Sequence, residues 1–331
     1  MLTYMIQCHN NYYAVRKLLS WLFHEDDLFI VSVDATSQFH AEDLGPFSAL
    51  KNVIIAPRHP ITWGGFSIVQ ATLSAIHTAL HYPDWRYFIN LSAVDLPLVT
   101  RAELLAQLAE DASAGVFNFV SDFGAVQIEP MIMAPGGDLR QVSITASSSA
   151  TVEVSGSVTD FLSPGAKYIS AFAPVTQPAK RPSFHVSESP AGKSLFCRPL
   201  YEYEVEIRNS FLINNEYHFG RQWVTLCRKS CAAIFESAIA TEVYHFVRDT
   251  FIPDEAFFQT LFNTEFGKRP GHGWKKHNQR YHYGAPVTIN DDNFVEILRS
   301  GSWFARKLDH QNAAQTIEMT DARMSSRLPA N

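Results

Sequence analysis

The chain lacks the features that mark several large classes of protein. Its 331 residues include four cysteines, at 8, 197, 227 and 231, which are too few and too scattered for a disulfide scaffold. Cys227 and Cys231 have no second Cys or His pair at zinc spacing, so we interpret all four as reduced, mostly buried thiols. No segment approaches the roughly 18 uninterrupted apolar residues of a membrane span. The chain starts directly with a strand-like segment and not with a charged and then apolar leader, which predicts a cytoplasmic protein.

Neither sign of charge dominates the composition. Lys and Arg number 27 against 33 Asp and Glu, a net charge of −6, so the surface as a whole does not indicate nucleic-acid binding. Hydrophobic residues make up 46% of the chain, which is enough for a full-size core. The P-loop pattern G-x-x-x-x-G-K-[ST], the elbow G-x-S-x-G and the zinc motif H-E-x-x-H are absent. The D-x-D carboxylate pair, with which many sugar-nucleotide enzymes hold Mn²⁺ or Mg²⁺, is missing as well.

The first third of the chain contains an alternation of strand and helix signals. Buried-strand patterns occupy 2–8, 28–33, 53–56 and 87–91, and apolar residues at helical spacing occupy 12–23 and 66–80. This order predicts an α/β fold with a parallel sheet, in which ligands bind at the carboxyl ends of the strands. Asp34 and Asp95 follow two of these strands and are therefore candidate site residues.

The composition changes between about 127 and 209, where a Ser/Thr-rich stretch and several prolines interrupt the pattern. Such insertions are functional loops, partner-binding segments or linkers, and composition does not choose between them. Regular patterns resume with a strand at 222–226 and with helices at 229–239, from 254, and at 291–298. We therefore predict one domain over 1–309 with a variable insertion, followed by a polar, loosely docked tail over 310–331.

Five segments in chain order form a recognisable pattern: W-G-G-F-S-I-V-Q-A at 63–71, F-I-N-L-S-A-V-D-L-P at 88–97, G-R-Q-W at 220–223, D-T-F-I-P-D-E at 249–255 and W-F-A-R-K-L at 303–308. The pattern resembles the core-2/I-branching N-acetylglucosaminyltransferase and peptide O-xylosyltransferase family. The resemblance covers most of 1–123 and 210–309 and fails over the middle insertion. The P-D-E and F-A-R-K segments are its specific parts.

The resemblance implies a GT-A-like nucleotide-sugar-binding fold, α/β with a mostly parallel central sheet and an inserted variable acceptor region. It implies an inverting glycosyltransferase that works without a bound metal or other cofactor. Such an enzyme would move a sugar, GlcNAc or xylose foremost, from a UDP-sugar to a hydroxyl of a glycan or lipid-linked saccharide and form a β linkage. We expect this activity in surface polysaccharide or glycoconjugate synthesis, in the cytoplasm or at the inner face of the membrane.

Sugar transfer needs a base for the acceptor hydroxyl and a positive charge for the departing diphosphate. Glu255 resembles the family's catalytic base, although Pro253-Asp254-Glu255 also fits an ordinary helix start. Lys307 resembles the lysine that contacts the diphosphate, and Arg280 and Arg306 are both candidates for the second basic residue of the family, which does not transfer cleanly. For Arg306 and Lys307 the alternative is a solvated charge pair.

Four more residues resemble the family's donor site. Asp34 would read the uracil or ribose, and a turn-initiating aspartate is the alternative. Arg58 would meet phosphate, and Trp63 would pack on sugar or base, although a lone Trp is more often core. Asp95 has Ala93 in place of the second D-x-D carboxylate, which favours hydrogen bonding over metal binding.

The acceptor side is the least specified. The segment 220–223 resembles the family's entry to a strand near the acceptor, with Trp223 matching the pattern and Arg221 replacing a small residue there. A glycine-dependent turn is the alternative. The basic and aromatic loop at 268–283, with Arg280 and Tyr283, suits an anionic glycan or a negative membrane surface. A solvated loop is its alternative.

Two other functions remain open at this point. The first is a non-catalytic glycan- or nucleotide-binding protein on the same scaffold. The second is a nucleic-acid-modifying transferase, suggested only by the basic loop and disfavoured by the net charge of −6.

Overall fold

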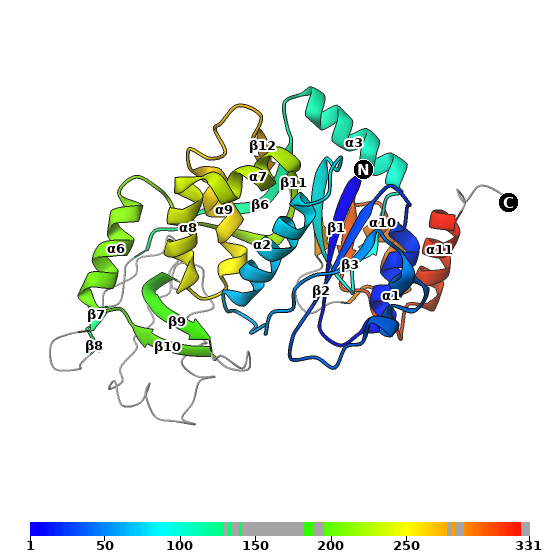
Figure 1. Cartoon of the computed structure of the whole chain (residues 1–331), viewed down its shortest axis with the longest axis horizontal. Helices are drawn as coiled ribbons and strands as arrows, with labels where there is room; N and C mark the ends of the chain where they lie inside the picture. The colour runs from blue at the N-terminus through cyan, green and yellow to red at the C-terminus, as the bar shows by residue number, and fades with distance from the viewer. Residues whose placement is uncertain are drawn as a thin grey trace.

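The structure is a computed structural model that describes residues 1–128, 132–133, 139–140, 182–188, 195–276, 280–282 and 288–325. Within these residues the central sheet has seven strands in the order β12-β6-β11-β4-β1-β2-β3 (Figure 1). The strands are β1 (Leu2–Cys8), β2 (Leu28–Val33), β3 (Val53–Ile55), β4 (Tyr87–Ser92), β6 (Asn118–Ala125), β11 (His218–Cys227) and β12 (Trp274–Lys276). The β1–β2, β2–β3, β1–β4 and β6–β12 pairs are parallel, whereas β11 runs antiparallel to both β4 and β6.

Both faces of the sheet are buried along β1, β2 and β4, which explains why these strands are mostly apolar. Alternate residues of β1 enter opposite cores, with Tyr4 and Ile6 on one side and Met5 on the other. The first core is covered by α1 (Tyr12–Leu22), α3 (Arg101–Ser113) and α10 (Phe294–Leu298). The second is covered by α2 (Ser67–Leu80), α7 (Arg228–Glu236), α8 (Ala238–Arg248) and α9 (Phe257–Asn263). The predicted α/β class with a mostly parallel central sheet is confirmed.

A smaller sheet brings the end of the chain back to the carboxyl end of β4. It has the order β13-β14-β5, formed by β13 (Arg280–His282), β14 (Phe304–Arg306) and β5 (Leu96–Pro97). The Leu308 N–H donates to the Val94 carbonyl at 2.9 Å, and the Leu98 N–H donates to the Trp303 carbonyl at 2.9 Å. The 303–308 motif therefore lies against the loop that follows β4.

The described part of the predicted insertion includes a hairpin of β9 (Phe184–Glu188) and β10 (Leu195–Pro199), then α6 (Glu202–Leu212). A second antiparallel pair is formed by β7 (Ile132–Met133) and β8 (Leu139–Arg140). Side chains of β9 and β10 pack on Phe251 and Ile252, and the Val186 N–H donates to the Asp249 carbonyl at 2.9 Å. The hairpin is thus attached to the 249–255 motif.

Three helix predictions need correction. The helix expected over 229–239 is two helices, α7 and α8, because Ser237 adopts an extended backbone and its hydroxyl caps α8. The segment from Asp254 begins with a 3₁₀ turn, Pro253–Glu255, and the α-helix α9 starts only at Phe257. The helix expected from Asp291 starts at Phe294.

The prediction of a loosely docked tail after His310 is wrong. The tail folds into α11 (Ala314–Ser325) beside α1 (Figure 1). Asp291 accepts hydrogen bonds from the first-turn N–H groups of α11, 2.6 Å from Thr316 N to Oδ1, so its carboxylate caps this helix. At the other end, Asp321 accepts from Lys17 Nζ and from Trp21 Nε1, both at 2.7 Å. No helix within the described residues is both long and apolar enough to cross a membrane.

Replacing Asp321 with Ala tests the docking of α11. The substitution removes two hydrogen bonds to α1 from a carboxylate that is 42% exposed, so we expect the free energy of unfolding to fall by about 1 kcal/mol. Urea denaturation followed by circular dichroism measures this change. Glu318→Ala, on the exposed face of the same helix, is the matched control and should change the free energy by less than about 0.5 kcal/mol. Equal stability of both variants would show that the contact contributes nothing.

Candidate functional site

A pocket of about 610 Å³ lies at the carboxyl ends of β1, β2 and β4, beside β11. Its lining includes five residues that the sequence singled out: Asp34, Trp63, Trp223, Arg306 and Lys307. They come from four regions of the chain, which the sheet order brings together. The position agrees with the expectation that ligands of such sheets bind beyond the strand ends.

Asp34 stands at the end of β2 with its carboxylate held by four donors. Its Oδ1 accepts from the N–H and hydroxyl of Thr36, at 2.8 and 3.0 Å, and from the Ile61 N–H at 3.2 Å. Its Oδ2 lies 2.8 Å from His9 Nδ1. Burial would raise the pKa of Asp34, but these hydrogen bonds outweigh it and lower the pKa. Asp34 is therefore a fixed, ionised acceptor at one end of the pocket.

Arg58 holds the backbone of the segment that contains Asp34. Its Nη2 donates to the backbone carbonyls of Asp34, at 2.8 Å, and Ser37, at 2.5 Å. The guanidinium thus fixes the loop after β2, and Arg58 is not among the residues that line the pocket. In this structure Arg58 acts on the shape of the loop.

Arg306 is the best-anchored cation of the pocket. Its Nε donates to Ser92 Oγ at 3.0 Å and lies 3.8 Å from Asp95 Oδ1, and its guanidinium lies over the Trp223 ring at 4.7 Å from the centroid. Burial lowers the pKa of Arg306, and the charges of Asp95 and Asp254 oppose that shift. An arginine remains charged under such conditions. Lys307, the next residue, lines the pocket and is exposed.

Asp95 does not line the pocket itself but forms an ion pair with Arg306, which does. It is fully buried, and its carboxylate accepts from the N–H and hydroxyl of Ser92 at 2.9 and 3.1 Å. These donors and the Arg306 guanidinium surround the carboxylate. In the part of the chain that the structure describes, no three His, Cys, Asp or Glu side chains are grouped to hold a metal ion.

The W-G-G turn and the 249–255 motif lie against each other. The Ile252 N–H donates to the Gly64 carbonyl at 2.8 Å, and Trp63 packs edge-on against Phe251 with the ring centroids 5.7 Å apart. Gly64 has φ +79°, and a Cβ there would lie 2.6 Å from the Phe251 ring, so the turn requires glycine. Trp63 is 70% exposed, which suits a ligand wall better than a core position.

Glu255 is the last residue of the 3₁₀ turn in this motif and is half-buried. It is absent from the lining of the pocket, but its neighbour Asp254 is close enough to Arg306 to affect the pKa of that guanidinium. Phe251 and Ile252 of the same motif support the pocket residue Trp63. Glu255 therefore lies beside the pocket, on the turn that leads into α9.

Of the four residues predicted for the acceptor side, Arg221 and Trp223 have described side chains. Trp223 is buried beneath Arg306, and Arg221 lies over the Phe123 ring at 5.5 Å from its centroid. The Arg280 backbone pairs with Phe304 between β13 and β14, while its side chain and Tyr283 lie outside the described residues. Cys8, Cys227 and Cys231 are free thiols and are buried.

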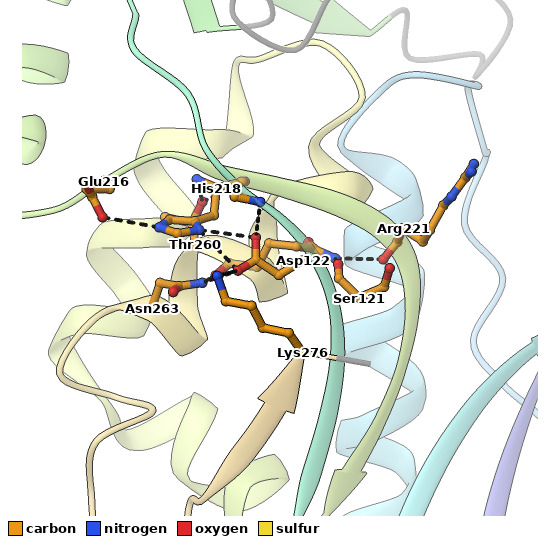
Figure 2. Close-up of polar contacts among 10 residues, drawn as sticks. Ser121, Asp122, Glu216, His218, Arg221, Thr260, Asn263 and Lys276 are labelled. Carbon is orange, nitrogen blue, oxygen red and sulfur yellow. Dashed lines mark hydrogen bonds and ion pairs between the residues drawn. The ribbon is translucent and has the colours of Figure 1, made fainter. Parts of the chain in front are cut away.

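A second polar cluster, which the sequence analysis missed, joins four elements around Asp122 of β6 (Figure 2). Its carboxylate accepts from Gly124 N at 2.9 Å, His218 Nδ1 at 3.1 Å, Asn263 Nδ2 at 3.1 Å and Lys276 Nζ at 2.7 Å. Burial would raise the pKa of Asp122, but these donors outweigh it and lower the pKa far below its ordinary value. A charged residue next to the buried stretch Phe119–Ser121 of the strand was the available signal, because a charged residue there needs partners.

Comparison with known proteins places this geometry in context. Residues 2–138 match the family model described as "Branch: Core-2/I-Branching enzyme", so the resemblance is confirmed there. Human xylosyltransferase 2 is 33% identical over 130 residues, which are 37% of this chain and 14% of that protein. The xylosyltransferase of Ciona intestinalis is 33% identical over 111 residues, 32% of this chain and 13% of that protein. The chain thus spans about one seventh of the length of these relatives.

A broader match reaches the end of the chain. The mouse N-acetyllactosaminide beta-1,6-N-acetylglucosaminyl-transferase is 21% identical over 348 aligned positions, 98% of this chain and 73% of that protein. Among solved structures, the crystal structure of TarS 1–349 from S. aureus covers 43% of this chain and 40% of its own, with 9% identity and a TM-score of 0.26. That overlap is limited to part of each chain.

Replacing Asp122 with Ala tests the second cluster. The change removes the buried carboxylate that four donors share, Nδ1 of the buried His218 among them, so we expect the free energy of unfolding to fall by about 3 to 5 kcal/mol. Urea denaturation at pH 7 measures it. Glu216→Ala is the control, because Glu216 contacts His218 only at 3.4 Å and its side chain is 74% exposed; its expected effect is below about 0.5 kcal/mol.

The sign of the pH dependence follows from the same carboxylate. Because folding lowers the pKa of Asp122, its contribution to stability is present above about pH 4 and is lost as the pH falls below that value. The Asp122→Asn variant should therefore lose less stability between about pH 4 and pH 2 than the wild-type chain. Parallel curves for the two proteins would contradict this assignment.

Proposed function

We propose that the chain is an inverting glycosyltransferase that moves a sugar from a UDP-sugar to a hydroxyl of a glycan or lipid-linked saccharide. The observation that carries the proposal is one pocket with an ionised acceptor, Asp34, at one end and a half-buried cation, Arg306, at the other. A nucleoside diphosphate has the complementary groups, N–H and hydroxyl donors on the nucleoside and negative charge on the diphosphate. The match of residues 2–138 to the Core-2/I-branching model supports it.

In this proposal the nucleotide lies along the strand ends. Asp34 accepts hydrogen bonds from the uracil N–H or the ribose hydroxyls. Arg306, with Lys307 at the mouth, stabilises the negative charge that grows on the diphosphate as the bond to the sugar breaks. Trp63 provides an exposed aromatic surface for the sugar or base.

Glu255 completes the chemistry as the general base. As the acceptor oxygen attacks the anomeric carbon, the Glu255 carboxylate takes the hydroxyl proton, and UDP leaves from the opposite face of the sugar. A single displacement inverts the anomeric centre, so an α-linked donor gives a β-linked product. Arg306 and Lys307 supply the positive charge here, and the proposed reaction needs no metal.

Measuring UDP release from a panel of UDP-sugars, UDP-GlcNAc and UDP-xylose foremost, in excess EDTA tests the activity. We expect one donor to give UDP release, and Glu255→Gln to lower the rate about 10²- to 10⁴-fold, because the variant cannot accept the proton. Glu265→Gln, an exposed acid after α9, is the matched control. An unchanged rate in Glu255→Gln would place the base elsewhere. Binding of UDP-sugars without release, even with glycan acceptors, would favour the non-catalytic alternative.

Replacing Arg306 with Ala tests the diphosphate end. Because hydrogen bonds to charged groups contribute about 1.5 to 3 kcal/mol, we expect the Kd for UDP to rise about 10- to 100-fold and the Kd for uridine to stay within about twofold. Isothermal titration calorimetry measures both. Arg299→Ala removes an exposed arginine at the end of α10 and should change neither Kd. An equal loss of uridine and UDP binding would show that Arg306 only shapes the pocket.

A further inference from the structure

The strand order gives the pocket a direction. From β2 through β1 and β4 to β11, the lining passes from Asp34 to His9, then to Ser92 and Trp223. The end with the hydrogen-bond acceptor Asp34 lies at β2, and the end with the cation Arg306 lies at β4 and β11. The lining also includes two glutamines, Gln7 at the end of β1 and Gln222 in β11.

The two glutamine side chains are hydrogen-bonded to each other across β4. Gln222 Nε2 donates to Gln7 Oε1 at 3.0 Å, and Gln7 Nε2 donates to Thr72 Oγ1 of α2 at 3.3 Å. A carboxamide has two N–H groups and an oxygen with two acceptor sites. The bonds described use one N–H of each glutamine and one acceptor site of Gln7, so the pair keeps donors and acceptors for a ligand in the pocket.

The backbone of β11 is irregular at Gln222. Between two paired positions the ladder advances from Gly220 to Val224 on β11 but only from Asp122 to Val120 on β6. In a regular strand, successive residues such as Gln222 and Trp223 face opposite sides, yet here both line the pocket. A bulge re-aims side chains in this way.

Asn90 of β4 holds the irregular segment in place. Its Nδ2 donates to the Gln222 carbonyl at 3.1 Å, and its Oδ1 accepts from the Val224 N–H at 2.7 Å. Asn90 is almost fully buried. The orientation of Gln222 is therefore fixed by the backbone as well as by Gln7.

We propose that Gln7 and Gln222 bind the hydroxyl or acetamido groups of the donor sugar and set the preference of the pocket among UDP-sugars. The inference rests on the proposed function. Neutral groups that both donate and accept suit sugar hydroxyls, whereas the anionic Asp34 and the cationic Arg306 suit the nucleoside and the diphosphate. Their place in the pocket, bound to neither charged group, agrees with this division.

The experiment compares the affinities for UDP and for each UDP-sugar that the wild-type chain binds, by isothermal titration calorimetry. In Gln222→Leu and in Gln7→Leu we expect the Kd for UDP to stay within about twofold. The Kd for the preferred UDP-sugar should rise about 3- to 10-fold in each, which corresponds to the loss of one or two neutral hydrogen bonds. The double variant should lose less than the product of the single losses, because the two side chains act as a bonded pair.

Two further variants keep the test decisive. Gln70→Leu makes the same substitution at an exposed position of α2 that does not line the pocket and should change no affinity. Gln222→Asn keeps a carboxamide on a shorter side chain and should also weaken UDP-sugar binding. It replaces Gln222→Leu in the test if that variant fails to fold.

Three outcomes separate the inference from the function on which it rests. A wild-type chain that binds neither UDP nor UDP-sugars would overturn the proposed function itself. Normal UDP binding with unchanged UDP-sugar affinities in the glutamine variants would overturn only the role of the pair. An equal loss for UDP and UDP-sugars would also overturn that role, since it would place the glutamines at the nucleotide.

Discussion

The half-buried guanidinium of Arg306 is the constraint on which the pocket depends. A charge in this position is stable only with good partners, and its partners are Ser92 at the end of β4, Asp95 in the loop after it and the ring of Trp223 in β11. These partners lie on two segments and Arg306 on a third, so the sheet order β11-β4 and the return of β14 must both be formed before the charge is satisfied. The same contacts that stabilise Arg306 therefore place a cation at the strand ends.

The site divides between two parts of the chain. The part that matches the family model, 2–138, supplies Asp34 and its supporting loops. The cation Arg306 lines the pocket and the candidate base Glu255 lies beside it. Backbone contacts attach their segments, Leu308 N to the Val94 carbonyl and Ile252 N to the Gly64 carbonyl. In the proposed function, the sheet would hold the nucleoside, and the later segments would complete the site by docking on it.

The sequence predicted what local patterns determine. Apolar runs located β1, β2 and β4 because both faces of the sheet are buried, and Asp34 followed from its place after β2. Long-range features were missed for a physical reason. The tail helix α11 is stabilised by Asp291 and Asp321 contacts with distant elements, and its polar sequence gives no sign of them. Asp122 and the pair of Gln7 and Gln222 depend on partners more than 90 positions away, which no spacing rule reveals.

The β11 strand connects stability to the geometry of the pocket. On one side of its irregular segment, the Asp122 cluster fixes His218 (Figure 2). On the other side, Asn90 fixes Val224. A Cβ at Gly220 would lie 1.7 Å from the Ser121 carbonyl oxygen, so the two strands approach too closely there for any other residue. Between these fixed points Gln222 and Trp223 can both face the pocket. A buried carboxylate outside the pocket is thereby an anchor of the strand that carries the partner of Arg306, and the cost of burying its charge is offset by the four donors that it brings together.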